Sequence, residues 1–190
     1  MKLFYLAFAG VLYLASFAGD AFAQAADHYI TIQLKSGPVV IQLLPDVAPK
    51  HVAQIEALVK KGEYDNVAFH RVIPGFMAQT GDVKYGNMEK NFDAAQAGTG
   101  GSDLPDLPAE FSKTPFVRGT VGMARAQDPN SANSQFFIMF DDGSFLNGQY
   151  TVVGKVVSGM ENVDKIKKGE GQNGEVSNPD RMIKVTMGKK

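Results

Sequence analysis

Short β-forming stretches separated by turns are the feature of this 190-residue chain that most limits its fold. The stretches are rich in β-branched and aromatic residues, and the segments between them are rich in Gly, Asp and Asn, as in strands joined by tight turns. Such a series favours a closed barrel or a sandwich, because both protect the edges of a sheet. The expected strands cover residues 29–34, 38–43, 68–72, 77–79, 120–124, 135–140, 151–157 and 182–187.

Two other segments have helical spacing. In the first, Pro49 suits the first turn of a helix and Gly62 provides the stop. Between them, apolar residues recur at helical spacing, at Val52, Ile55, Leu58 and Val59. In the second, Met160, Val163 and Ile166 recur at every third position. We therefore expect a mainly β domain with two helices covering its core.

The N-terminus is predicted to be a cleaved targeting segment. Lys2 provides a positive start, residues 3–17 are apolar and uncharged, and Ala21-Phe22-Ala23 is a small-x-small cleavage site. The apolar run is shorter than the roughly 20 residues that span a bilayer. We expect cleavage after Ala23, giving a signal peptide over residues 1–23 and one domain over residues 24–190.

Composition excludes several classes of function. The chain has no cysteine, which excludes disulfides, thiol catalysis and lipid attachment through cysteine. The formal net charge is −1, which gives no support for binding to nucleic acid, or to a membrane after signal cleavage. The three histidines show no metal-ligand spacing, so no metal site is expected. A monomer with a single domain is the simplest expectation.

Two motifs carry the functional signal. Residues 69–82 read FHRVIPGFMAQTGD, and residues 134–140 read SQFFIMF. The first places Arg71 on a strand, turn and strand whose alternation sends its side chains to defined faces. Together the motifs closely resemble the active-site signature of the cyclophilins, a family of peptidyl-prolyl cis-trans isomerases. That resemblance implies a closed eight-stranded antiparallel β-barrel capped by a helix at each end, with substrate in a groove on the outside.

The resemblance covers nearly the whole domain. Further matching segments follow in the family's order: GTGGS at 98–102, GTVGMARA at 119–126 and FLNG at 145–148. The match implies that Arg71 is the catalytic residue, and that the proline pocket consists of Phe76, Met77, Phe137 and Leu146. It also implies further substrate-binding positions: Gln79 and Gln135, which steady the arginine and line the groove, His70 at the groove edge, and Ala124, Arg125 and Ala126 along the substrate backbone.

Three positions depart from the commonest pattern of the family. Phe145 stands where tryptophan is frequent, Tyr150 where histidine is common, and Arg125 where asparagine is usual. None of these changes removes the arginine or the apolar pocket. The resemblance implies that the tryptophan donates a hydrogen bond in tight cyclosporin binding, and phenylalanine has no such donor. We therefore expect weak cyclosporin binding.

An arginine beside an apolar pocket suits the rotation of an X-Pro bond. Twisting the amide breaks its resonance and localises a lone pair on the prolyl nitrogen, which can then accept a hydrogen bond. A donor that meets only this twisted nitrogen stabilises the transition state and not the ground state. Arginine stays charged and holds its donors in a rigid fork. The reaction needs no nucleophile and no proton transfer, so no cofactor is expected.

Other interpretations of single motifs are weaker. His70 would serve as a general base only in a reaction that moves a proton, so a groove-edge role is favoured. Residues 98–102 resemble a phosphate-binding loop, yet no lysine follows them and no parallel βαβ pattern surrounds them, which favours a structural turn lining the groove. Residues 141–143 lack the spaced ligands of a calcium loop.

The sequence thus predicts an exported isomerase that assists folding by acting on X-Pro bonds of unfolded or partly folded proteins. Its partners would be proline-containing polypeptides. The signal segment predicts export, and the resemblance to the shorter bacterial cyclophilins implies a bacterial periplasm. The alternative is a non-catalytic module or holdase chaperone that binds proline-containing peptides on the same scaffold. Retention of Arg71 beside an intact apolar pocket favours the enzyme, because a pure binder does not need the arginine.

Overall fold

A computed structural model describes residues 28–90, 92–171 and 173–188 of the protein. The predicted signal peptide and its cleavage site lie outside these residues. The described chain begins with a β-hairpin formed by β1 (Tyr29–Leu34) and β2 (Gly37–Leu43). The pair of residues next to its turn is Leu34 and Gly37. Gly37 has a φ of 134°, which favours glycine. Alternate residues of both strands are buried, as the sequence pattern predicts.

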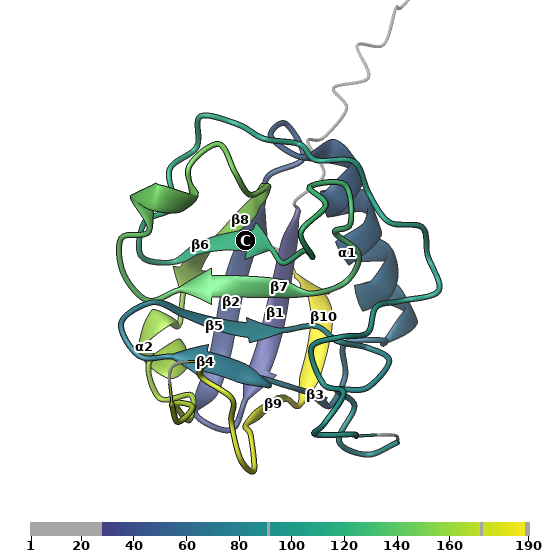
Figure 1. Ribbon diagram of the computed structural model, residues 1–190, viewed down its shortest axis with the longest axis vertical. Coiled ribbons are helices and arrows are strands. Elements are labelled where there is room, and N and C mark those ends of the chain that lie inside the picture. The colour runs from purple at the N-terminus through teal and green to yellow at the C-terminus, as the bar shows by residue number, and fades with distance from the viewer. Residues whose placement is uncertain (1–27, 91, 172, 189–190) are drawn as a thin grey trace, which may run out of the picture.

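Helix α1 (Pro49–Lys61) confirms the predicted signals at both ends. Proline occupies the first turn, and Gly62 ends the helix in the left-handed conformation with its N–H bonded to the Val59 carbonyl. The predicted apolar stripe is buried. In Figure 1 the helix lies along one side of the sheet, where it packs against β10 (Lys184–Gly188).

The remaining elements are short, as expected for strands separated by turns. The second predicted helix is shorter than its spacing indicates, because i to i+3 hydrogen bonds tighten the turns from residue 162 to Ile166, although Ile166 remains buried. These elements are β3 (Val67–Ala68), β4 (Arg71–Ile73), β5 (Met77–Thr80), β6 (Thr120–Met123), β7 (Phe136–Met139), the 3₁₀ turn η1 (Ser144–Leu146), β8 (Val152–Ser158), α2 (Met160–Val163) and β9 (Arg181–Met182).

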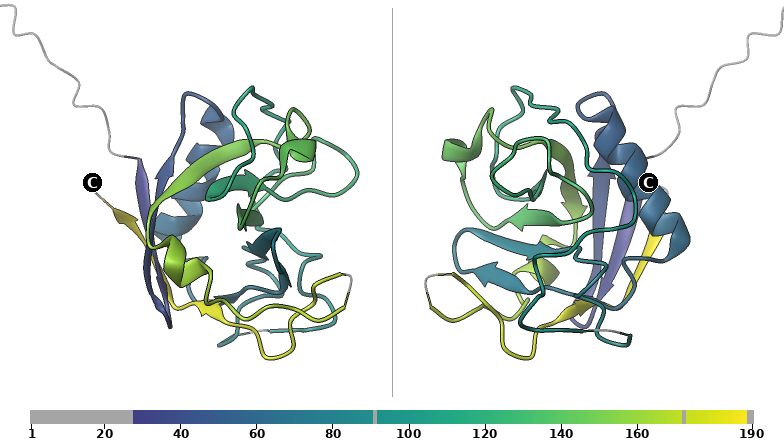
Figure 2. Two further views of the ribbon diagram at one scale, coloured as in Figure 1. Left: turned by 90° about the vertical axis from the view of Figure 1, so that its left-hand side faces the viewer. Right: turned by 45° about the vertical axis from the view of Figure 1, so that its right-hand side comes forward.

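Eight of the strands form one antiparallel sheet in the order β10-β1-β2-β8-β6-β7-β5-β4. In Figure 1, β6, β7, β5 and β4 cross in front of β1, β2 and β10, and Figure 2 shows the sheet curling between these two walls. The prediction of a mainly β, eight-stranded antiparallel fold with two helices is confirmed. Strands β10 and β4 remain the sheet edges, so the predicted continuous closure is not seen. Instead β3 and β9, which adjoin these edges in the chain, pair as a separate two-stranded sheet.

The main apolar core fills the space inside the curl. It combines the inward residues of β1 and β2, the buried face of α1 and the inward residues of the crossing strands. Tyr64 and Phe136 meet edge to face at 5.6 Å within it, and the Tyr64 hydroxyl donates to the Ser134 carbonyl. Burial raises the pKa of Tyr64 far above its usual range. No helix within the described residues is both long and apolar enough to cross a membrane.

Candidate active site

The register of β4, β5, β7 and β6 gathers the predicted residues on the outer face of the sheet. Arg71 lies opposite Gln79, Gln79 opposite Phe137, and Phe137 opposite Gly122. Directly opposite residues of an antiparallel pair point to the same face, so these side chains form one row across four strands. The next row, in which Val72 is paired with Ala78, points into the core. Strand alternation alone separates the site from the core.

The outer face carries its own apolar cluster, distinct from the core. Phe116 stacks beneath Phe137 with 5.7 Å between ring centroids, and Tyr150 meets the other side of Phe137 edge-on at 5.9 Å. Together these contacts hold the Phe137 ring in place. The cluster consists of Met77, Phe116, Phe137, Met139, Leu146 and Val152, with partly buried residues packed around it.

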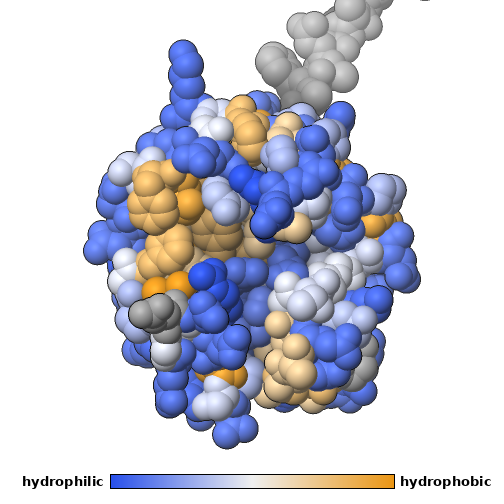
Figure 3. Space-filling model, viewed as in Figure 1, coloured by the Kyte–Doolittle hydropathy of each residue, from blue (hydrophilic) through white to orange (hydrophobic). Residues whose placement is uncertain are grey.

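A pocket of about 310 Å³ opens above this cluster. Charged side chains form one wall of this pocket, and apolar side chains form its floor. Phe145 stands at its mouth with 63 % of its surface exposed, and packs on Phe76 with 5.4 Å between ring centroids. In Figure 3 apolar side chains gather on this face beside a hollow. The pocket is lined by Arg71, Phe76, Met77, Gln79, Ala124, Arg125, Phe137, Phe145, Leu146 and Tyr150.

Arg71 is held at the wall of the pocket by two fixed acceptors. Its Nε donates to the Asn173 carbonyl at 2.8 Å, and its Nη1 donates to Gln79 Oε1 at 3.4 Å. Gln79 in turn donates from Nε2 to Gln135 Oε1 at 3.0 Å. Within the described residues, Nη2 of Arg71 makes no hydrogen bond. The guanidinium is therefore held by two acceptors and keeps Nη2 without a partner within the described residues.

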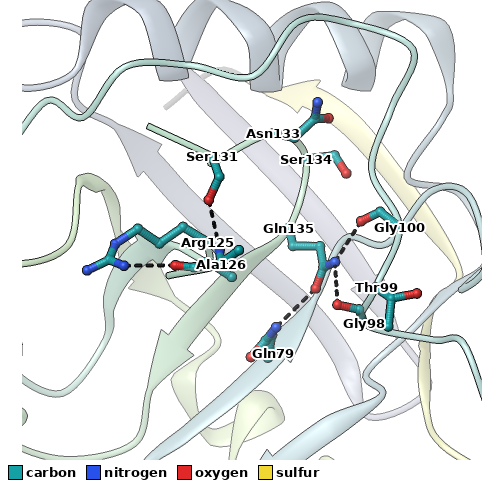
Figure 4. A pocket seen from close by; sticks show the side chains of 11 residues that line it. Gln79, Gly98, Thr99, Gly100, Arg125, Ala126, Ser131, Asn133, Ser134 and Gln135 are labelled. Carbon is teal, nitrogen blue, oxygen red and sulfur yellow. Dashed lines mark hydrogen bonds between the residues drawn. The ribbon is translucent and has the colours of Figure 1, made fainter. Parts of the chain in front are cut away.

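A second cavity of about 360 Å³ adjoins the pocket and shares Gln79, Ala124 and Arg125 with it. Figure 4 shows Gln135 projecting into it, with its amide nitrogen bonded to the carbonyl oxygens of Gly98 and Gly100 at 3.0 and 2.7 Å. The chain at Ala126, beyond the end of β6, forms another wall. Its lining is Gln79, Gly98, Thr99, Gly100, Ala124, Arg125, Ala126, Ser131, Asn133, Ser134 and Gln135. The two cavities form one continuous groove.

A buried carboxylate fixes the loop that anchors this network. Asp82 is fully buried, and its Oδ2 accepts the N–H groups of Gly98 and Gly100 at 2.7 and 2.9 Å. Its Oδ1 accepts two further N–H groups from its own turn. Charge-assisted bonds of this kind are strong. These bonds fix the position of the two glycine carbonyls that accept from Gln135. Hydrogen bonds therefore link Asp82, through the glycine loop and the two glutamines, to Arg71.

Comparison with known proteins agrees with this geometry. Residues 29–187 match the family model described as "Cyclophilin type peptidyl-prolyl cis-trans isomerase/CLD". The chain belongs to the cyclophilin family. A "Probable peptidyl-prolyl cis-trans isomerase" of Brucella suis is 73% identical over 168 residues, which cover 87% of this chain and 86% of that protein. "Peptidyl-prolyl cis-trans isomerase A" of Dickeya dadantii is 36% identical over 168 residues, covering 86% of this chain and 83% of that protein.

Solved cyclophilin structures share the fold. A cyclophilin from Hirschia baltica superposes with a TM-score of 0.70 at 28% identity, covering 85% of this chain and 74% of that one. A cyclophilin-type isomerase from Cryptosporidium parvum, crystallised in the presence of the dipeptide Ala-Pro, superposes with a TM-score of 0.68 at 24% identity, covering 85% of this chain and 99% of that one. The predicted family and activity are thus confirmed: the protein is a peptidyl-prolyl cis-trans isomerase of the cyclophilin type.

Twelve of the thirteen residues predicted for the cyclophilin site line the groove, ten of them in the apolar pocket and Ala126 and Gln135 in the adjoining cavity. His70 is the exception. It is only 8% exposed and lines a separate cavity of about 160 Å³ with residues that include Phe92 and Glu175. Gly98 packs over its ring. His70 therefore lies behind Gly98, which lines the groove, and outside both of the groove's cavities.

The chemistry of His70 follows from its burial. Burial lowers the pKa of the imidazole, although the nearby charge of Asp82 opposes that shift. His70 lies in the short break between β3 and β4, whereas Arg71 beside it begins β4 and lines the groove.

Several groove residues were missed by reasoning from the sequence. Ser131, Asn133 and Ser134 line the second cavity, and Phe116 supports the pocket floor from below. Ser131 and Asn133 belong to a polar stretch whose composition indicates turns and nothing further. Phe116 lies far along the chain from Phe137, and no pattern in the sequence links the two. In the described residues, no group of three or more acidic, histidine or cysteine side chains forms a candidate metal centre.

Proposed function

We propose that the apolar pocket holds the ring of a substrate proline while Arg71 donates a hydrogen bond to the twisting prolyl nitrogen. The observation that carries this assignment is the orientation of Arg71. Its Nε and Nη1 are held by Asn173 and Gln79, its Nη2 has no partner within the described residues, and the side chain lines the apolar pocket. Such a donor is pre-organised for a lone pair that exists only in the transition state.

The lowering of the rotation barrier is too large for the Arg71 hydrogen bond alone. The barrier to rotation is about 18–20 kcal/mol, and a rate increase of 10⁴ to 10⁵ corresponds to roughly 5–7 kcal/mol at ~1.4 kcal/mol per tenfold. One charge-assisted hydrogen bond provides about 1.5–3 kcal/mol. We assign the remainder to the apolar pocket, which holds the proline ring and removes water from the amide. Desolvation disfavours the planar, charge-separated resonance form relative to the twisted state.

The decisive variant is Arg71→Ala. It is expected to lower kcat/KM for a short X-Pro peptide by about tenfold to a hundredfold, because it removes the donor and leaves the pocket. The exchange rate is measured by NMR, together with circular dichroism to verify the fold. Arg118→Ala is the matched control, because Arg118 pairs with Asp164 away from the groove. Full activity of Arg71→Ala contradicts the assignment, and a native protein without isomerase activity favours a peptide-binding module.

The N-terminal segment is the basis for a proposal about the compartment in which the isomerase acts. We infer that the isomerase is exported, acts as a monomer in the periplasm, and serves unfolded or partly folded exported proteins. The supporting pattern is Lys2, the apolar run of residues 3–17 and the Ala21-Phe22-Ala23 site. N-terminal sequencing of protein from a periplasmic extract is expected to begin at Gln24. An uncleaved N-terminus in the cytoplasmic fraction contradicts export.

Weak cyclosporin binding is the remaining proposal. Phe145 presents an apolar ring without a donor at the mouth of the pocket, and its high exposure places it where a bound ligand would meet it. A ligand that relies on a hydrogen bond at this position loses that bond here.

A further inference from the structure

Arg125 is a second cation of the groove, held in a fixed position by neutral groups. Its Nη1 donates to the carbonyl oxygens of Ala126 and Gln127 at 2.8 and 3.1 Å, and its Nη2 donates to the Gln149 carbonyl at 3.1 Å. The guanidinium carbon lies 4.5 Å from the centre of the Tyr150 ring. The side chain is half-buried. Carbonyls and an aromatic face orient a guanidinium, but they leave its unit charge uncompensated.

The position of Arg125 makes that charge available to substrate. Arg125 lines both the apolar pocket and the adjoining cavity, so any chain that passes from one to the other runs beside it. The only charged side chains among the described residues that line the two cavities are Arg71 and Arg125. No salt bridge within the described chain involves either of them. The groove therefore carries two positive charges, although the chain as a whole has a formal net charge of −1.

We propose that Arg125 determines specificity, by giving the groove a preference for X-Pro segments that carry a carboxylate side chain at one of the two positions before the proline or at the position after it. The proposal rests on the isomerase function assigned to the same groove. Arg71 faces the prolyl nitrogen, so Arg125 is the cation left for a neighbouring side chain of the substrate. A half-buried cation is less screened than one on the open surface, and a carboxylate can accept the second N–H of Nη2 in a charge-assisted bond, since the Nε of Arg125 is buried. Lysine at the same substrate position meets repulsion from both arginines.

A peptide series with the full chain tests this proposal. Blocked tetrapeptides carry a single Glu at each of the two positions before proline or at the position after it, and matched sets carry Gln or Lys there. NMR exchange gives kcat/KM for each, normalised to the uncatalysed rate. In low salt we expect a Glu-over-Gln ratio of about threefold to tenfold at one or more positions, a ratio that shrinks in ~0.5 M salt, and a Lys peptide poorer than its Gln counterpart.

Arg125→Gln is expected to reduce the Glu-over-Gln ratio to about one, since it removes the charge and keeps a polar side chain of similar reach. Arg118→Gln is the matched control and is expected to keep the native ratio, because Arg118 lies outside both cavities. Arg125→Lys keeps the charge and is expected to retain part of the preference. It serves as the second variant if circular dichroism shows that Arg125→Gln does not fold.

The outcomes separate this proposal from the function on which it rests. A native protein that accelerates none of the peptides contradicts the isomerase function itself. One that accelerates Glu, Gln and Lys peptides equally overturns the acidic preference and leaves the isomerase intact. A native Glu preference that survives in folded Arg125→Gln overturns the proposed role of Arg125 in specificity. The role of Arg125 is then structural only, through its hydrogen bonds to the carbonyls of Ala126 and Gln149.

Discussion

Gln79 and Gln135 are joined side chain to side chain, with Gln79 Nε2 donating to Gln135 Oε1 at 3.0 Å. The bond links two neighbouring parts of the groove. On one side Gln79 accepts from Arg71, and on the other side Gln135 donates to the carbonyls of Gly98 and Gly100. Arg71 is thus oriented by carbonyl oxygens, in a network that Asp82 supports at its far end through the loop of Gly98 and Gly100.

Replacing Gln135 by leucine tests whether this network positions Arg71. We expect kcat/KM for a neutral X-Pro peptide to fall about threefold to tenfold, because Gln79 loses its partner and with it the hydrogen bond of ~0.5–1.5 kcal/mol that positions Arg71. KM is expected to change less than kcat, because the arginine acts mainly in the transition state. Gln33→Leu is the control, since Gln33 lies on β1 and bonds only to the adjacent Leu34 carbonyl. A Gln135→Leu protein that loses stability but keeps its kcat excludes the positioning role.

Gly122 is expected to be essential to the pocket floor. A Cβ at this position would lie 2.5 Å from Phe116 and 2.6 Å from Phe137. Gly122→Ala therefore forces the Phe137 ring towards the pocket, and we expect a loss of about 1–3 kcal/mol in the free energy of unfolding together with a higher KM. Urea unfolding and peptide kinetics measure the two effects. Gly188→Ala, next to an exposed strand end, is the control, and equal behaviour of both variants refutes the prediction.

Phe145→Trp is expected to increase cyclosporin inhibition. The indole adds an N–H donor at an exposed position on the mouth of the pocket, and a neutral hydrogen bond of ~0.5–1.5 kcal/mol corresponds to about twofold to tenfold in affinity. Inhibition constants of the native protein and the variant are compared on the same peptide. Equal inhibition would show that the missing donor does not limit binding.

Glu110 makes the fold sensitive to acid. Its carboxylate accepts the N–H groups of Lys50 and His51 at the start of α1 and the Nδ1 of buried His51 at 2.7 Å. Burial alone raises the pKa of Glu110, but these hydrogen bonds outweigh burial and hold the pKa below its usual range. A lowered pKa in the folded state stabilises the fold above the unfolded pKa of about 4.3, and that contribution is lost as the pH falls through the folded value.

Glu110→Gln is accordingly expected to cost about 0.5–2 kcal/mol at pH 7, the range for the loss of a helix cap, and less at pH 3. Urea unfolding at both pH values measures the difference from the native protein. Glu63→Gln, just beyond the other end of α1, provides the control for a general charge effect. A native-to-variant difference that does not change with pH contradicts the assignment of this stability to the ionised carboxylate.

Local elements were predictable because their signals are local. The proline and glycine that bound α1 and the alternation of β1 and β2 set backbone conformation within a few residues. The spacing of Met160 and Ile166 predicted a longer second helix than α2, because periodicity indicates which residues are buried and does not distinguish an α-helix from a series of tight turns. Burial was predicted correctly there, and the hydrogen-bond pattern was not.

The residues of the groove were predictable through resemblance, and their contacts were not. Arg71 and Phe137 are 66 positions apart in the sequence, and only the register of β4, β5 and β7 places them in one row. The match likewise did not indicate that His70 is buried behind Gly98 and lines a separate cavity.

The sequence by itself determined the strand-forming stretches and the well-defined α1 helix, because residue type and short-range spacing act on the backbone locally. Through its resemblance to the cyclophilins it also determined the family and twelve of the side chains that line the groove. The tertiary structure alone decided how the sheet curls and where its edges lie, that Asp82 holds the loop that orients Gln135, that His70 is buried, and that Arg125 stands uncompensated between two cavities. Those properties depend on long-range packing, strand register and desolvation, which no local pattern encodes.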